Sequence, residues 1–252
     1  MAKLFKLYAF NLSAMLLVGA CSNPGHMEQR SRYSTEDLQH VARSVTDSDV
    51  RRFVNLMSGE FDSFQQMQAD EAAGVEGDKK HSRVNRYFMK IDAPKIGDAV
   101  LVGSTRYGGP PNWYFDKTEF LVWTVYVTEN GQHLKMSPRK FKDIEPKISI
   151  AKNADAFSGV LPAELEKATS GAACDIIWTK DGDGFLGESL PCKVLSTTQG
   201  VELNWSWKYQ VLPDALWVEF SGATEEGKIL FSTPKGSPYR LDEIQVGSAD
   251  AF

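Results

Sequence analysis

Three cysteines are the residues of this 252-residue sequence with the most specific chemistry. Two of them, Cys174 and Cys192, flank Asp181-Gly182-Asp183-Gly184, a run of residue types typical of a tight turn between strands. If the chain reverses at position 183, directly opposed residues have numbers that add up to 366, as 174 and 192 do. Opposed residues of an antiparallel pair have Cα atoms roughly 4.5–5.5 Å apart, which a disulfide can bridge. The spacing favours a Cys174–Cys192 disulfide, and two buried free thiols are the alternative.

The third cysteine, Cys21, follows an N-terminal segment with the features of a secretory signal. Lys3 and Lys6 precede an apolar stretch that ends at Val18 and is short for a membrane-spanning helix. The ending Val-Gly-Ala-Cys resembles the bacterial lipoprotein cleavage box, in which the cysteine becomes the lipidated first residue of the mature protein. We therefore expect residues 1–20 to be a lipoprotein signal peptide and Cys21 to carry the lipid. An ordinary signal peptide that is cleaved nearby is the alternative.

Lipidation would hold the protein on a membrane outside the cytoplasm, since each buried methylene of an acyl chain contributes roughly 0.8 kcal/mol. Ser22 at the second mature position is not an aspartate retention signal, which favours the outer membrane of the cell envelope, facing the periplasm. Cys174 and Cys192 would then remain as a pair in an oxidising compartment, where disulfides form. The formal net charge of −5, without a long basic run, argues against a nucleic-acid partner.

Hydrophobic periodicity divides the rest of the chain into a short helical part and a long strand-rich part. Residues 21–34 are polar and are expected to be a flexible tether. Residues 35–58 show helical spacing and predict one broken helix or two short ones, whereas the charged residues 70–81 predict a loop. From Gly59 onward the period is two, and we expect strands at 59–66, 83–92, 98–106, 118–128, 132–137, 174–180, 184–190, 193–197, 200–208, 214–220, 228–233 and 238–244.

So many short strands after one helical segment predict a mainly β fold, either an antiparallel barrel or a sandwich. The barrel is favoured because closure removes the sheet edges that aggregate. A barrel of about eight to ten strands can enclose a small ligand. We expect residues 35–248 to form this domain, including its N-terminal helices.

Three motifs follow one another along the chain: LMSGEFDSFQQ, then CDIIWTKDGDGFLGES, then GSPYRL. In this order they resemble the opening, the cysteine hairpin and the closing strand of the CpcT/CpeT family of phycobilin (chromophore) lyases. The resemblance implies an antiparallel lipocalin-like (calycin-type) β-barrel with an N-terminal helical segment. It also implies a lyase that joins a linear tetrapyrrole to a cysteine of a phycobiliprotein.

The sequence departs from the family where polar residues are expected. Family members usually carry a Glu-Gln pair in the third strand and arginines in the next. Here Gly103 and Ser104 stand where the pair is expected, and apolar residues replace the arginines in TEFLVWTVY, where Tyr126 remains.

A bilin-attaching barrel requires an apolar slot, cations for the propionates, and an acid that protonates the vinyl or ethylidene carbon before thiolate attack. Arg106 is the expected replacement cation, and Glu60 or Asp62 could serve as the acid; core packing for the aromatic residues and outward exposure for the charged ones are the alternatives. Trp205 and Trp207 share one face of a strand and are expected to point inward; a contact surface on the outside is the alternative. The expected ligand-pocket residues are Tyr87, Arg106, Trp123, Tyr126 and Trp178.

Metal binding and hydrolytic chemistry have no local support in the sequence. The run DGDG lacks the third acidic position and the terminal glutamate of an EF-hand loop, and the four histidines are scattered. Two functions remain. One is a chromophore-lyase-family lipoprotein that binds or attaches a linear tetrapyrrole-like (bilin) ligand, with no other cofactor implied. The other is a non-catalytic envelope lipoprotein whose barrel binds an apolar ligand or an envelope protein.

Overall fold

The computed structural model describes residues 44–108, 114–115, 121–143, 157–168, 174–196, 199–234 and 236–244. The predicted signal peptide, Cys21 and the tether lie outside these residues, as does the first part of the expected helical segment. The chain divides into two compact units, Met1–Ala42 and Arg43–Phe252, and all the described residues belong to the second. The described helices and strands are therefore elements of this second unit alone.

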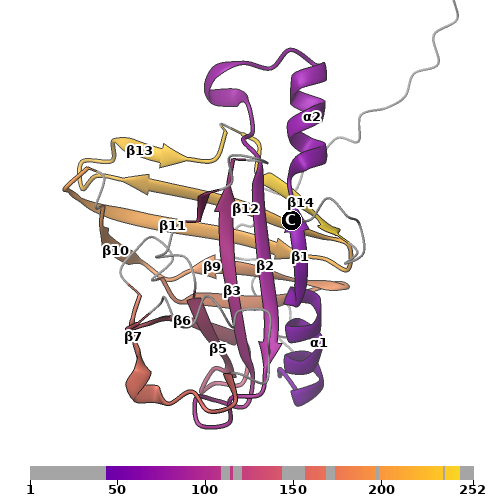
Figure 1. Ribbon diagram of the computed structural model, residues 1–252, viewed down its shortest axis with the longest axis vertical. Helices are drawn as coiled ribbons and strands as arrows, with labels where there is room; N and C mark the ends of the chain where they lie inside the picture. Colours follow the sequence, from indigo (N-terminus) through magenta and orange to yellow (C-terminus); the bar gives the residue numbers. More distant parts are fainter. Residues whose placement is uncertain are drawn as a thin grey trace, which may run out of the picture. The chain divides into compact units, whose positions relative to one another are not determined.

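Ten of the described strands form one closed antiparallel ring (Figure 1). Each strand pairs with the next along the ring, β11 also pairs with β12, and β14 returns to β1. The mainly β, antiparallel barrel predicted from the sequence is therefore confirmed. In ring order the strands are β1 (Gly59–Asp62), β2 (Val84–Ile91), β3 (Val100–Tyr107), β5 (Leu121–Val127), β6 (Leu134–Phe141), β8 (Ile176–Asp181), β9 (Gly184–Ser189), β11 (Glu202–Val211), β12 (Ala215–Ala223) and β14 (Tyr239–Ile244).

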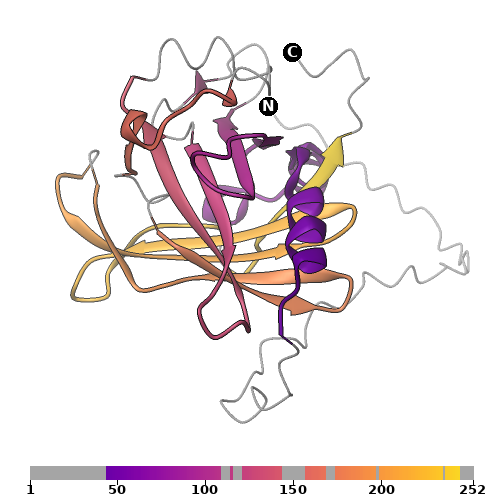
Figure 2. The ribbon, with the colours of Figure 1, turned by 90° about the horizontal axis from the view of Figure 1, so that it is seen from below.

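Four more of the described strands pair on the outside of this ring. β4 (Tyr114–Phe115) pairs with β3, and β7 (Leu165–Lys167) pairs with β6. β10 (Cys192–Leu195) lies beside β11, and β13 (Ile229–Ser232) lies beside β12. β10 and β13 therefore continue the sheet beyond the place where β11 and β12 close the barrel (Figure 2).

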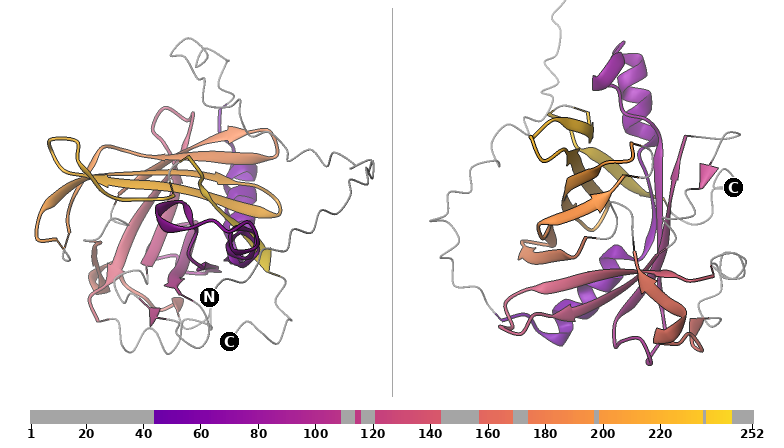
Figure 3. Two further views of the ribbon diagram at one scale, coloured as in Figure 1. Left: turned by 90° about the horizontal axis from the view of Figure 1, so that it is seen from above. Right: turned by 90° about the vertical axis from the view of Figure 1, so that its left-hand side faces the viewer.

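Within the described ranges, two α-helices accompany the barrel, α1 (Asp47–Met57) and α2 (Phe64–Ala72). A capping box starts α1: the Thr46 hydroxyl accepts from the Asp49 N–H, and the Asp49 carboxylate accepts from the Thr46 N–H. The buried face of α1 includes Phe53 and Met57 and packs against β2, β5 and β9 (Figure 3). None of the helices in the described ranges is long and apolar enough to cross a membrane.

Helix α2 corrects the expectation of a strand over 59–66 followed by a loop over 70–81. The strand ends at Asp62, whose carboxylate accepts a hydrogen bond of 2.8 Å from the Phe64 N–H. This side chain takes up a backbone donor at the start of the helix, and good helix formers follow it. A 3-10 helix, η2 (Gly77–Lys79), lies further along the expected loop.

The cysteine hairpin has the predicted pairing but not the predicted register. Asp181 pairs with Gly184, so the turn consists of the two residues Gly182 and Asp183, and opposed numbers add up to 365. Gly182 has a φ of +54°, a conformation that glycine adopts at little cost. Cys174 and Cys192 lie just beyond the β8–β9 ladder and still form the disulfide, with a Cα–Cα distance of 5.6 Å. The disulfide prediction is therefore confirmed.

Most buried apolar residues that the structure describes belong to two clusters, one on each side of the wall built by β2, β3 and β5. Inside the barrel, Leu121 and Trp123 join a large core that also contains Phe53 and Trp178. Val122 points the other way, into a second cluster. This arrangement explains why strand β5 is apolar on both faces. The other buried members of the second cluster are Ile91, Ala93, Val100, Val102, Phe141, Phe157, Val160 and Leu165.

Candidate functional site

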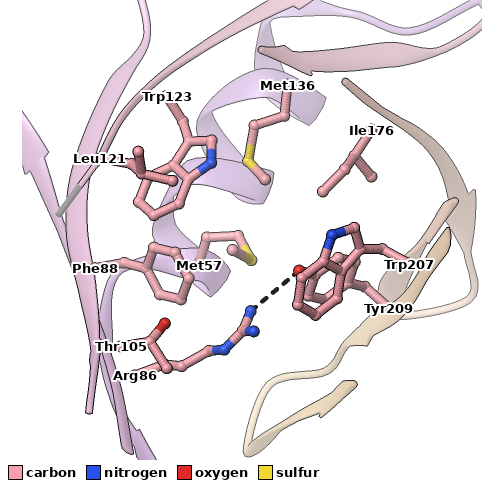
Figure 4. Close-up of a pocket in the computed structure, with 10 residues that line it drawn as sticks. All are labelled: Met57, Arg86, Phe88, Thr105, Leu121, Trp123, Met136, Ile176, Trp207 and Tyr209. Carbon is pink, nitrogen blue, oxygen red and sulfur yellow. Dashed lines mark hydrogen bonds between the residues drawn. The ribbon is translucent and has the colours of Figure 1, made fainter. Parts of the chain in front are cut away.

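A cavity lies inside the barrel, between the end of α1 and the inner faces of six strands (Figure 4). The empty space there is about 450 Å³ when the solvent at the opening is included, and the space enclosed between the side chains is narrow. Apolar and aromatic side chains make most of its lining. The ten lining residues are Met57, Arg86, Phe88, Thr105, Leu121, Trp123, Met136, Ile176, Trp207 and Tyr209.

Arg86 is the only charged residue among these ten. It stands between the buried Val84 and Phe88 on β2, and strand alternation turns all three side chains toward the interior. Only 7% of Arg86 is exposed, and its Nη1 donates a hydrogen bond of 3.1 Å to the hydroxyl of Tyr209 (Figure 4). The guanidinium also lies over the rings of Trp207 and Tyr209, 5.2 and 5.5 Å from their centroids. Cation–π contacts and a hydroxyl acceptor thus offset part of the cost of burying a charge.

Aromatic rings form two walls of the cavity. Trp207 and Tyr209 on β11 are stacked, with centroids 5.5 Å apart and planes at 20°. On the facing wall, Phe88 and Trp123 have centroids 5.1 Å apart. The cavity therefore combines flat aromatic walls with one cation, an arrangement that suits an apolar ligand carrying a carboxylate.

The structure brings one of the five expected pocket residues to this cavity. Trp123 lines it. Trp178 points into the barrel but is fully buried against Phe53 and Tyr209, with centroid distances of 4.7 and 5.5 Å. Tyr126 is 41% exposed, and its hydroxyl lies 3.2 Å from Ser137 Oγ.

The other two expected pocket residues, Tyr87 and Arg106, share the opposite face of the wall. Arg106 donates to Glu60 Oε1 at 2.7 Å and to Asn85 Oδ1 at 2.9 Å. Desolvation, together with the nearby charge of Glu60, raises the pKa of Tyr87. This polar group is therefore separate from the cavity.

Neither carboxylate that we expected as an acid lines the cavity. Glu60 accepts hydrogen bonds from Arg106 and from the side-chain amide of Asn85, the latter at 2.8 Å. Asp62 accepts hydrogen bonds from Arg83 at 2.9 to 3.2 Å. Both side chains lie on the face of β1 opposite to Phe61, which points into the core.

Sequence reasoning overlooked Arg86 and placed the tryptophans of β11 correctly. Trp205 packs on the interior core and Trp207 lines the cavity, so both face inward as expected. The sequence does contain a signal for Arg86: it lies two residues from both Val84 and Phe88, so all three share one face of the strand. In the described ranges, no group of three histidine, cysteine, aspartate or glutamate side chains is arranged to hold a metal ion.

Comparison with known proteins gives structural matches only. No family model matches the sequence, and no curated protein matches it. The CRL protein of Arabidopsis has a similar structure, with a TM-score of 0.55 and 13% identity, over 78% of this chain and 98% of that protein. The T-type phycobiliprotein lyase CpeT from Prochlorococcus phage P-HM1 aligns with a TM-score of 0.44 and 16% identity, over 79% of this chain and all of the lyase. The chain therefore shares its barrel fold with the CRL protein of Arabidopsis.

Proposed function

We propose that the barrel binds an extended apolar ligand that carries a carboxylate, and that this ligand is a linear tetrapyrrole (bilin). The observation that carries the proposal is the burial of Arg86 in a cavity that is otherwise lined by aromatic and aliphatic side chains. A bilin combines a flat conjugated body with propionates. Its body would lie between the ring walls, and one propionate would meet the guanidinium of Arg86.

The proposal takes Arg86 in place of Arg106 as the cation of the site. Arg106 faces the other side of the wall and is held by Glu60. Arg86 reaches the cavity from the neighbouring strand, with the Tyr209 hydroxyl beside it. Similarity of motifs to the CpcT/CpeT family is the second support for a bilin as the ligand.

We restrict the proposal to non-covalent binding. Attachment to a cysteine needs an acid close to the reacting carbon of the ligand. The two carboxylates expected for that role are engaged by arginines outside the cavity. In the cavity, the described hydroxyl groups are those of Thr105 and Tyr209.

A visible absorption titration tests the proposal. The purified full chain is mixed with biliverdin or phycocyanobilin, and we expect a shifted band that saturates at one ligand per chain. Arg86→Met should weaken binding about 10- to 100-fold, because a hydrogen bond to a charged group contributes about 1.5–3 kcal/mol. Arg86→Lys should recover part of the affinity.

The matched control is Arg52→Met, which removes an arginine that pairs with Asp183 on the surface. This variant should bind like the unchanged protein. Thermal unfolding of each variant separates loss of the site from loss of the fold. An unchanged spectrum with both bilins would disprove the proposal and leave the partner-binding function as the remaining candidate.

A further inference from the structure

Aromatic side chains continue from the cavity along the inner face of β11, β12 and β13. We call Trp205, Phe220 and Phe231 the aromatic track. The track begins at Trp207 of the cavity, whose ring centroid lies 5.1 Å from Phe220 and 5.9 Å from Trp205. Trp205 lies 6.0 Å from Phe220 with nearly parallel planes, at 4°, and 6.1 Å from Phe231. The chain of ring contacts is therefore continuous from Arg86 to β13.

Strand register places the track on one face of the sheet. Trp207 pairs with Phe220, while Trp205 and Phe231 both pair with Gly222. A Cβ atom on Gly222 would lie 2.7 Å from ring atoms of Trp205, so the indole ring lies directly on the backbone at this position. A glycine is required here for the ring to lie flat along the sheet.

The track differs from the cavity in its exposure. Trp207 and Tyr209 are buried, whereas Trp205, Phe220 and Phe231 are partly exposed. The strands that carry the track extend to the left in Figure 1, beyond β2 and β3, with β10 and β13 as outer strands. The track therefore leads out of the closed barrel onto the part of the sheet that lies beyond the ring.

A second observation at the track points to a ligand. The indole N–H of Trp205 is buried, and the described part of the chain offers it no hydrogen-bond acceptor. An unsatisfied buried donor is unfavourable, and most buried donors in folded proteins have a partner. An acceptor brought to Trp205 by a ligand would satisfy it after a small shift of the covering side chains.

We infer that the aromatic track is the outer half of the ligand site and holds the part of a linear tetrapyrrole that the narrow cavity cannot contain. The inference rests on the proposed function. With one propionate at Arg86, the distal pyrrole rings would stack on Trp205 and Phe231, as flat conjugated groups do on aromatic side chains. The lactam carbonyl of the terminal ring would accept a hydrogen bond from the indole N–H of Trp205.

Two ligands of different length test the inference on the full chain. Biliverdin is long enough for both halves of the site, whereas a dipyrrinone carboxylic acid, about half as long, fills the cavity alone. Trp205→Leu should weaken biliverdin binding about tenfold and leave the binding of the dipyrrinone unchanged. Phe231→Leu should act in the same direction with a smaller effect, and it removes a ring that lies closer to the edge of the sheet.

Leu195→Ala is the matched control. Leu195 is exposed on β10 next to the core residue Val194, so its side chain points to the opposite face of the same sheet extension. This variant should bind both ligands like the unchanged protein, and Arg86→Met should weaken both.

The outcomes separate the inference from the proposed function. If both ligands bind and neither track variant changes the biliverdin affinity, the inference is wrong and the proposed function stands. An equal loss for biliverdin and the dipyrrinone would also contradict the inference, because Trp205 would then act through the fold. If neither ligand binds the unchanged protein, both proposals fail.

Discussion

At the residue scale, the hydrogen bond between Arg86 and Tyr209 joins strands that are far apart in the sequence. The guanidinium from β2 and the phenol from β11 meet inside the barrel, with 3.1 Å between donor and acceptor. A buried guanidinium that loses an acceptor must bear more of its desolvation cost. The pair therefore stabilises the interior as well as shaping the candidate site.

Tyr209→Phe tests this pair, because it removes the hydroxyl and keeps the ring. The free energy of unfolding should fall by about 1.5–3 kcal/mol, the usual contribution of a hydrogen bond to a charged group. Urea unfolding followed by circular dichroism measures it. Tyr126→Phe removes an exposed hydroxyl and should change stability by less than about 0.5 kcal/mol. Equal stability of the two variants would contradict this account.

Gly187 provides a second test at this scale. A Cβ atom there would lie 2.7 to 2.8 Å from ring atoms of Trp178, which is fully buried. Gly187→Ala should therefore force the indole to move and lower the free energy of unfolding by about 1–3 kcal/mol. In Gly159→Ala the new methyl group meets no atom within 4 Å, so this control should be nearly neutral. A stable Gly187→Ala variant would show that the core around Trp178 is loosely packed.

The sequence could not decide which side of the wall Arg106 faces. Alternation of polar and apolar residues shows which side chains of a strand point to the core only when one face of the strand is polar. On β3, Val100 and Val102 lie in the outer apolar cluster while Leu101 lies in the inner one, so both faces appear apolar. Because the second cluster makes the outer face of β3 apolar as well, the sequence did not show that Arg106 points to the outside. On β2, the spacing from Val84 and Phe88 indicated that Arg86 points inward, but a buried arginine was not expected.

At the element scale, side-chain contacts of Asp49 and Arg52 connect α1 to the β8–β9 hairpin. Lys180 donates to the carboxylate of Asp49 at 2.6 Å, and Arg52 donates to Asp183. The hydrogen bond from Lys180 lowers the pKa of Asp49 to about 2, with burial acting in the opposite direction. Because the pKa in the folded state lies below the usual value of 3.8, the interaction stabilises the fold above about pH 4 and is lost as the pH falls toward 2.

Asp49→Asn removes the charge that Lys180 contacts and should lower the free energy of unfolding at pH 7 by about 1–2 kcal/mol. The loss is modest because solvent screens the half-exposed Lys180. The variant should also lose less stability than the unchanged protein between pH 4 and pH 2. Urea unfolding at several pH values measures both effects. Asp183→Asn is the control, because that carboxylate is 89% exposed and should contribute little. Parallel acid profiles for the unchanged protein and Asp49→Asn would contradict the assignment.

The disulfide is a second connection between elements. It joins the segment before β8 to the start of β10, across a sequence separation of 18. The double variant Cys174→Ala, Cys192→Ala should lower the free energy of unfolding by about 2–4 kcal/mol. Thiol labelling of the unreduced protein should find neither cysteine free. Labelling at either position would contradict the pairing.

The hairpin and α2 show which elements could be predicted. A run of turn residues between apolar segments was sufficient for the hairpin and its disulfide, while the register differed by one because the turn has two residues rather than a central one. The start of α2 depends on Asp62, which accepts a backbone donor as well as an arginine. Short-range periodicity does not reveal such a dual role, and the helix was therefore missed.

At the scale of the whole molecule, the prediction of a lipid anchor concerns Cys21. If the lipoprotein cleavage box is used, the mature chain begins at Cys21 and carries acyl groups there. Mass spectrometry of the N-terminal peptide from the membrane fraction should show this modification, and Cys21→Ala should abolish it. A mature chain that begins elsewhere, with an unmodified N-terminal peptide, would favour an ordinary signal peptide.

The barrel itself could be predicted because many apolar segments of strand length are separated by turn residues. The size of the cavity inside it could not be predicted, because the volume left between side chains depends on how α1 and the facing strands fill the interior. Phe53 and Met57 of α1 occupy much of that interior, and they leave the narrow cavity beside Arg86. The size of a ligand site is thus a property of the packing of the whole unit.

The pairing of β1 with β14 has a consequence for how the chain is made. Asp62 lies opposite Asp242, so the wall becomes continuous only when β14 pairs with β1, a strand far from it in the sequence. Until then β1 and β12 present bare edges to other chains, and such edges promote aggregation. Contacts between residues so distant along the chain also form slowly. The edges of β1 and β12 therefore stay open to other chains during folding until β14 docks between them.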